Sequence, residues 1–163
     1  MYTDTPILTP RLKLVLESPD EVRERLDQMA PEAMVEVSPE WLARIRAATD
    51  SDPWLHGFAM RGRTSGDPIG SIGFKGPPGD DGVVEIAYAV EPDHQGNGFA
   101  TEATLAITAW ALGDIRVRIV RAHTLPEKNA STRVLTKSGF KFLGEMTDPE
   151  DGQVWRWKRN SLI

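Results

Sequence analysis

A glycine-containing turn between a strand pattern and a helix pattern is the stretch of this sequence best suited to hold an anion. Residues 83–90 read VVEIAYAV, a β-branched and aromatic run that predicts a strand. Residues 95–100 read QGNGFA, after which alanine and leucine recur at helical spacing as far as Leu112. A helix N-terminus carries unpartnered amide protons and roughly half a positive charge, and glycines let a phosphate approach the backbone closely. We therefore expect a phosphate site made of main-chain amides; the alternative is a turn whose glycines serve geometry alone.

Glu85 is the second candidate for chemistry, because it is the only carboxylate within the strand predicted over residues 83–90. A charged group in an otherwise apolar run is costly unless it is paired or used. Glu85 is therefore a candidate general base. The alternative is an ion pair with an arginine of a neighbouring strand, such as Arg118 or Arg121.

Length and composition limit the classes of protein that this chain can represent. Its 163 residues suit one domain, residues 1–163, and 40% hydrophobic with 26% charged residues is ordinary for a globular protein. No apolar run could span a bilayer and no secretory signal is recognisable, which favours a cytoplasmic location and no membrane partner. With no cysteine, disulfides and a thiol nucleophile are excluded. The net charge of −5 argues against nucleic-acid binding and suits a cationic acceptor.

The remaining elements are predicted from alternation, capping residues and turn residues. Polar and apolar residues alternate over 11–16, and Ser-Pro pairs at 18–19 and 38–39 mark helix starts. The expected order is β-α-α-β-β-β-α-β-α-β-β, a mixed α/β fold. The expected strands are 11–16, 54–61, 69–74, 83–90, 117–123, 140–143 and 154–158, and the expected helices are 18–29, 38–48, 99–112 and 129–138, with a loop after Pro31.

Two motifs resemble those of the GNAT N-acetyltransferase superfamily. The turn Gln95-Gly96-Asn97-Gly98-Phe99-Ala100 is similar to (Gln/Arg)-x-x-Gly-x-(Gly/Ala), the acetyl-coenzyme A loop of that family. Residues 129–140, NASTRVLTKSGF, resemble its second signature, in which an asparagine and a serine precede Gly-Phe. Residues 99–103, FATEA, resemble the branch that contains the ribosomal-protein N-terminal acetyltransferases. The resemblance covers residues 11 to about 157 and implies the GNAT fold, a mixed sheet of six to seven strands with helices on both faces.

The resemblance also implies how acetyl-coenzyme A is bound, without a metal. Strand 83–90 and the fifth strand would splay apart, so that the pantetheine arm pairs with main chain at Tyr88, Ala89 and Val90. Asn129 and Ser131 would line the pantetheine and the thioester; the alternative for Asn129 is a helix N-cap. The diphosphate would rest on the amides of the turn, which are those of Gln95, Gly96, Asn97, Gly98, Phe99, Ala100 and Thr101.

The implied reaction is attack of a primary amine on the thioester in a ternary complex. An amine with a pKa of about 8 to 10 is mostly protonated at neutral pH, so a base is needed. Glu85 is the candidate base, through a water. Many family members carry a tyrosine as general acid where Leu135 stands here, which leaves Ser131 as the candidate acid; proximity alone could also suffice.

The acceptor amine cannot be identified from these residues, because its pocket comes from the least recognisable part of the chain. Trp41 and Trp54 lie in segments that wall the acceptor cleft in this family, and residues 148–151 form either a solvated acidic turn or the rim of that cleft. His123 is expected to be structural, and no metal site is expected because the three histidines stand far apart. Dimers are frequent in the family, so a homodimer is one expected assembly.

Two other functions compete with acetyl transfer. A dinucleotide site would need a glycine or alanine where Thr101 stands, and a doubly wound sheet. A non-catalytic acyl-coenzyme A binding module keeps the fold and drops the chemistry, and the missing tyrosine leaves room for it.

Overall fold

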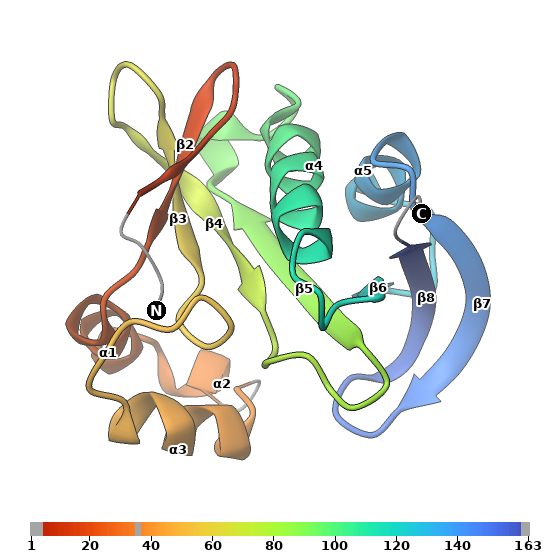
Figure 1. Ribbon diagram of the computed structural model, residues 1–163, viewed down its shortest axis with the longest axis horizontal. Helices are drawn as coiled ribbons and strands as arrows, with labels where there is room; N and C mark the ends of the chain where they lie inside the picture. The colour runs from red at the N-terminus through yellow and green to blue at the C-terminus, as the bar shows by residue number, and fades with distance from the viewer. Residues whose placement is uncertain (1–4, 35–36, 161–163) are drawn as a thin grey trace.

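A computed structural model of the chain describes residues 5–34 and 37–160. They form one eight-stranded sheet in the order β1-β2-β3-β4-β5-β6-β8-β7, with helices against it (Figure 1). The strands are β1 (Ile7–Leu8), β2 (Leu12–Leu16), β3 (Phe58–Gly62), β4 (Pro68–Phe74), β5 (Val83–Val90), β6 (Ile119–Thr124), β7 (Lys141–Asp148) and β8 (Gly152–Asn160). The helices are α1 (Pro19–Asp27), α2 (Pro31–Met34), α3 (Pro39–Ala47), α4 (Phe99–Leu112) and α5 (Ala130–Lys137), with a 3-10 turn, η1 (Pro92–His94).

The predicted mixed α/β fold is confirmed, with eight strands in place of six to seven. The additional strand, β1, is only two residues long and pairs antiparallel with β2, so it carries no alternation that the sequence could reveal. The stretch after Pro31, expected to be a loop, contains the single turn of α2. Among the residues that the structure describes, no helix has the length and apolar character needed to cross a bilayer.

Three helices begin at the predicted capping residues. The hydroxyl of Ser18 accepts a hydrogen bond from the amide of Glu21 at 3.1 Å, and the hydroxyl of Ser38 accepts one from the amide of Trp41 at 3.3 Å. The side chain of Asn129 caps α5 by accepting from the amide of Thr132 at 3.0 Å. Side chains of this kind satisfy amides that the first turn leaves free.

The sheet opens between β5 and β6, the only parallel pair of neighbours among the described strands (Figure 1). Their pairing runs from Val83 opposite Ile119 to Ile86 opposite Ala122 and stops there, although β5 continues to Val90. The last four residues of β5 pair with β4 only. The predicted splay between these two strands is therefore present.

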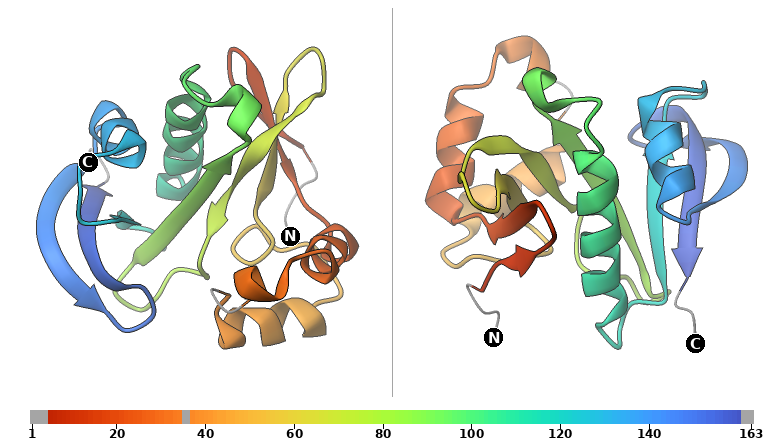
Figure 2. Two further views of the ribbon diagram at one scale, coloured as in Figure 1. Left: turned by 180° about the vertical axis from the view of Figure 1, so that it is seen from behind. Right: turned by 90° about the horizontal axis from the view of Figure 1, so that it is seen from above.

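The main core lies between the sheet and α4. Ile72, Phe74, Val84 and Ile86 are each at most 5% exposed, and Trp110 of α4 packs against the ring of Phe74. Burial of one such side chain is worth about 1.5–3 kcal/mol. Because side chains alternate along a strand, the residues between these positions point to the opposite face of the sheet. Views from behind and from above show α1 to α3 gathered at one end of the molecule, apart from α4 and α5 (Figure 2).

The strand expected over residues 54–61 begins only at Phe58. Residues 53–56 form a turn in which Asp52 accepts hydrogen bonds from the amides of Trp54, Leu55 and His56. The turn places Trp54 in the core, 1% exposed, with its ring 4.7 Å from that of Phe74.

Candidate active site

The glycine turn between β5 and α4 presents a row of amides without partners. Gly96 and Gly98 have φ values of 78° and 83°, which favour glycine. In the part of the chain that the structure describes, the main-chain N–H groups of residues 96–101 donate no hydrogen bond. The amide of Gln95 differs from the expectation, because it already donates to the carbonyl of Pro92 at 3.3 Å. The free donors therefore begin at Gly96.

Side chains of the turn hold it in this shape. The side-chain Nε2 of Gln95 donates to the carbonyl of Val90 at 3.0 Å, and the side-chain Nδ2 of Asn97 donates to the carbonyl of His94 at 3.2 Å. Gly98 is the N-cap of α4 and supplies no side-chain acceptor. The first turn of α4 therefore keeps its donors available for an anion.

Arg11, which no sequence motif indicated, braces this turn from the segment between β1 and β2. Its Nε donates to Glu102 at 2.9 Å, its Nη1 donates to the carbonyl of Asn97 at 2.9 Å, and its guanidinium lies 4.4 Å from the ring centre of Phe99. The hydroxyl of Thr9 and the main-chain amide of Arg11 also donate to Glu102. Partial burial alone would raise the pKa of Glu102, but these hydrogen bonds outweigh it and hold that pKa below 4.5.

Replacement of Arg11 by glutamine should weaken both the turn and the fold. We expect the free energy of unfolding to fall by about 1–2 kcal/mol and coenzyme A to bind about 10-fold more weakly. The stability contributed by Glu102 is present above its ordinary pKa, so the loss should shrink as the pH falls below about 4.5. Chemical denaturation at pH 7 and pH 4 and calorimetric titration measure these effects.

Arg23→Gln is the matched control for that substitution. Arg23 also binds main-chain carbonyls, those of Ala48 at 2.9 Å and Ile45 at 3.5 Å, and one carboxylate, that of Asp20 at 2.8 Å, but it lies in α1. This variant should lose stability and keep its affinity for coenzyme A. Equal loss of affinity in both variants would show that Arg11 has no particular role at the turn.

The opening between β5 and β6 is bordered by Tyr88 and the first turn of α5. The Tyr88 hydroxyl lies 3.5 Å from the main-chain oxygen of Ser131, to which it donates. Burial raises the pKa of Tyr88, against the effect of that hydrogen bond, so the phenol stays protonated. Asn129 acts as the N-cap, the structural alternative stated above, and a cap can also border the opening.

Glu85 belongs to a cluster of charged residues on the sheet face that does not contact α4. Its Oε2 lies 2.7 Å from the ammonium of Lys75, which in turn lies 2.6 Å from Oδ2 of Asp151. Partial burial opposes the charge on Lys75, but the hydrogen bonds and charges of the two carboxylates raise its pKa above 10.5. The expected arginine partners, Arg118 and Arg121, are not the ones that the structure places on Glu85.

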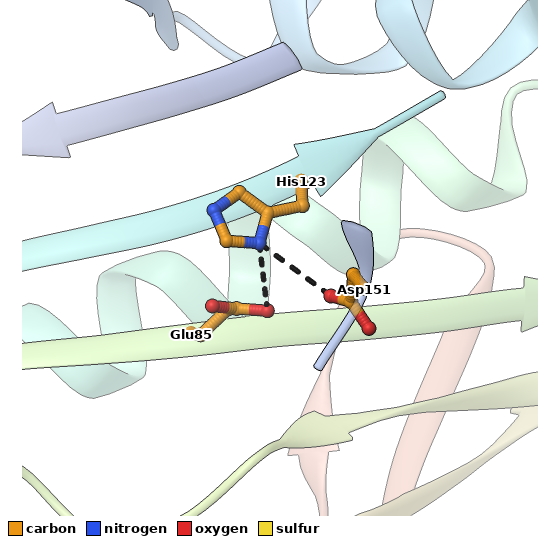
Figure 3. Close-up of side chains that lie close together, drawn as sticks. All are labelled: Glu85, His123 and Asp151. Atoms are coloured by element: carbon orange, nitrogen blue, oxygen red, sulfur yellow. Dashed lines mark ion pairs between the residues drawn. The ribbon is translucent and has the colours of Figure 1, made fainter. Parts of the chain in front are cut away.

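His123 faces the same two carboxylates (Figure 3). Its Nδ1 lies 3.3 Å from Oε2 of Glu85 and 3.6 Å from Oδ2 of Asp151, and its side chain is 4% exposed. Glu85, His123 and Asp151 could offer ligand atoms that all lie within 4.8 Å of one another, which their spacing in the sequence did not predict. However, Nε2 of His123 accepts a hydrogen bond from Nε of Arg156 at 2.9 Å, and arginine can only donate. The proton of the neutral imidazole is therefore on Nδ1, which faces the carboxylates without forming a hydrogen bond to either and does not suit a metal.

A cleft of about 630 Å³ adjoins this cluster. Its floor is made by residues with little or no side chain, Gly57, Ser71, Gly73 and Ala87. Gly73 and Ala87 are cross-strand partners, and a Cβ on Gly57 would lie only 3.2 Å from the Cα of Gly73. These positions keep the floor open beside the end of the β5–β6 pairing.

The walls of the cleft come from α3 and from the turn between β7 and β8. Trp41 lines it and donates its Nε1 hydrogen to the carbonyl of Leu55 at 3.0 Å. Trp54 was expected to contact the acceptor, but it is buried in the core and does not line the cleft. Residues 149–151 form the opposite rim, and Glu150 lies 3.5 Å from the hydroxyl of Ser38. The acidic turn therefore borders the cleft.

The family of the chain follows from comparison with known proteins. Residues 10–141 match the acetyltransferase (GNAT) domain family. The chain belongs to the GNAT acetyltransferase family. This GNAT chain is 32% identical over 72 residues to the uncharacterized N-acetyltransferase YjdG of Bacillus subtilis, a match that covers 44% of this chain and 43% of the relative. It is 30% identical over 84 residues to YoaA of the same organism, covering 52% and 48%, so the matched parts span about half of these relatives.

Solved structures share the fold of this GNAT chain at low sequence identity. A putative ribosomal-protein-serine acetyltransferase from Vibrio cholerae has a TM-score of 0.71 at 16% identity, covering 98% of this chain and 99% of that one. RimL, a ribosomal alpha-N-protein acetyltransferase in complex with coenzyme A, has a TM-score of 0.67 at 16% identity, covering 95% and 97%. An aminoglycoside acetyltransferase in complex with coenzyme A and kanamycin has a TM-score of 0.65 at 19% identity, covering 92% and 95%.

Proposed function

We propose that this chain is an N-acetyltransferase that moves the acetyl group of acetyl-coenzyme A to a primary amine. The observation that carries the proposal is the row of free amides over residues 96–101, at the N-terminus of α4. A diphosphate accepts hydrogen bonds from such a row without any lysine, and the positive end of the helix dipole adds to the attraction. Membership of the GNAT family and neighbours solved with coenzyme A support the same ligand.

The pantetheine arm enters the opening between β5 and β6 in this proposal. Tyr88, Ala89 and Val90 lie beyond the last β5–β6 pair, so main-chain groups on that side are available to an extended ligand, apart from the Val90 carbonyl, which accepts from the Gln95 side chain. The arm then brings the thioester to the cleft where Ala87 and the Glu85 cluster lie. Asn129 and Ser131 border it from α5.

Acetyl transfer needs one proton removed and one supplied. The amine nitrogen attacks the thioester carbonyl, Glu85 takes the amine proton directly or through a water, and the carbon–sulfur bond breaks to release the coenzyme A thiolate. The hydroxyl of Ser131 is the candidate donor to that sulfur. Holding the amine against the thioester supplies a large part of the acceleration by itself.

A small effect is expected at Ser131, because a thiolate is a good leaving group. Ser131→Ala should lower kcat by less than about 10-fold, below the usual 100-fold or more of a general acid. Thr136→Ala is the control, since the Thr136 hydroxyl only donates to the carbonyl of Thr132 in the same helix. Steady-state thiol release measures both; a loss of 100-fold or more at Ser131 would make it an obligatory acid.

The ion pair between Lys75 and Glu85 favours a second function, a module that binds acetyl-coenzyme A without transferring the acetyl group. A carboxylate oxygen that already lies against an ammonium, at 2.7 Å in this ion pair, is not free to accept the proton of an acceptor amine. Thiol release from acetyl-coenzyme A with a panel of amines and N-terminal peptides separates the two functions. Binding without turnover for every acceptor would support the module, and no binding at all would contradict both.

A further inference from the structure

Lys75 stands where the ammonium of an acceptor amine would be held. Its ammonium bridges Glu85 and Asp151 at 2.7 Å and 2.6 Å, and Lys75 and Asp151 both line the cleft. We infer that Glu85 and Asp151 form a subsite for the ammonium of a cationic acceptor, and that Lys75 occupies this subsite until the acceptor displaces it. The inference rests on the proposed function and adds to it the class of acceptor and two residues, Lys75 and Asp151, that select it.

The subsite is supported from behind by a buried donor. The side chain of His123 is 4% exposed, and its Nδ1 points at both carboxylates without a hydrogen bond of its own (Figure 3). Arg156 fixes that orientation by donating to Nε2 and lies 3.8 Å from Asp148, in the hairpin that carries Asp151. A buried donor therefore still faces both carboxylates when Lys75 leaves.

The size of the subsite fits one ammonium group. The facing oxygens of Glu85 and Asp151 lie within 4.8 Å of one another, which admits a single nitrogen at hydrogen-bond distance from both. Two carboxylates this close repel each other unless a cation lies between them. An acceptor ammonium can replace Lys75 without leaving either charge unpaired.

Lys75 can leave because only its side chain is in the subsite. Its main-chain amide donates to the carbonyl of Glu85 at 2.9 Å, which keeps the backbone in place. The side chain is 37% exposed and has four rotatable carbon–carbon bonds, so it can turn into solvent.

The charge of the cleft favours a cationic acceptor. With Glu85, five carboxylates and three cations surround it, and the two arginines are already paired, Arg25 with Glu17 and Arg44 with Glu40. Lys75 is therefore the cation whose exchange opens a carboxylate pair.

Binding of two similar amines tests the inference without any turnover. Benzylamine is protonated at neutral pH and aniline is neutral, so they differ mainly in charge. In calorimetric titrations of the protein saturated with coenzyme A, Lys75→Met should bind benzylamine about 10-fold more tightly than the unmodified protein, with aniline unchanged. When Asp151→Asn is added to the Lys75→Met variant, that gain in benzylamine affinity should disappear. If Lys75→Met does not fold, Lys75→Gln, which keeps a polar side chain, takes its place in the same titrations.

Two results would overturn the inference. One is unchanged benzylamine affinity in both Lys75 variants, which would make Lys75 a permanent structural partner of Glu85. The other is an equal gain for aniline, which would show that only space was created. Neither result bears on acetyl transfer, which fails only if the unmodified protein releases no thiol from acetyl-coenzyme A with any acceptor.

Steady-state kinetics supply a further readout once an acceptor is found. Asp151→Asn should raise KM for a cationic acceptor about 10-fold and leave kcat within about two-fold, because Asp151 binds the ammonium without taking its proton. A fall in kcat with unchanged KM would contradict the role given to Asp151.

Discussion

Replacement of Glu85 by glutamine should lower kcat for acetyl transfer by about 100-fold or more. The change removes the carboxylate oxygen that accepts the amine proton in the proposed mechanism and keeps the size of the side chain, and general bases commonly contribute 100- to 10,000-fold. The Kd for coenzyme A should change by less than two-fold, because Glu85 lies at the cleft, away from the free amides of residues 96–101. Thiol release and calorimetric titration give the two numbers.

Glu145→Gln is the control for the loss of one negative charge. Glu145 lies on β7 with its side chain exposed, outside the cleft and the turn, so this variant should keep both kcat and Kd. If Glu85→Gln keeps more than about a third of the activity, Glu85 is not the base, and its carboxylate serves the ion pair with Lys75. A large loss of coenzyme A affinity would show instead that the substitution disturbs the sheet.

Replacement of Gly96 by valine should weaken coenzyme A binding by about 100-fold, or about 2.7 kcal/mol. A side chain at φ 78° is strained, and a branched one would push the turn away from the conformation that presents its amides. The space beside Gly96 is open in the protein itself, since a Cβ there would meet no atom within 4 Å. Loss of affinity would therefore report on the ligand and on the shape of the turn.

Gly66→Val is an unusually close control for that substitution. Gly66, between β3 and β4, has φ 74°, and a Cβ there would also meet no atom within 4 Å. Both variants should lose about 1–3 kcal/mol of unfolding free energy from backbone strain, but Gly66→Val should bind coenzyme A normally. If Gly96→Val also binds normally, the diphosphate does not rest on this turn and the proposed function loses its main support.

Local patterns were sufficient for the elements around the glycine turn of residues 95–100. The strand over residues 83–90 and the helix over 99–112 have the predicted limits, because β-branched residues, glycines and helical spacing act over a few neighbours. The capping residues Ser18, Ser38 and Asn129 were found for the same reason. Elements of two to four residues, such as β1 and α2, have too few residues for any period to be read.

Positions that depend on packing were predicted less well. Trp54 was expected to line the acceptor cleft, but the turn formed by Asp52 directs its ring into the core against Phe74. The last two strands were expected to be four and five residues long and instead have eight and nine, because their mutual pairing extends them toward the turn over residues 149–151.

The amino-acid sequence by itself determined the fold class, the glycine turn with its free amides and Glu85 as the carboxylate to test, because each of these depends on a short segment or its pattern. Only the tertiary structure decided which groups surround Glu85 and which residue braces the turn. Lys75 meets Glu85 through the register of β4 and β5, His123 and Asp151 come from segments far along the chain, and Arg11 reaches Glu102 across more than ninety residues. A shift of one residue in any of those pairings would turn the side chains to the other face of the sheet, so no local pattern could have predicted these contacts.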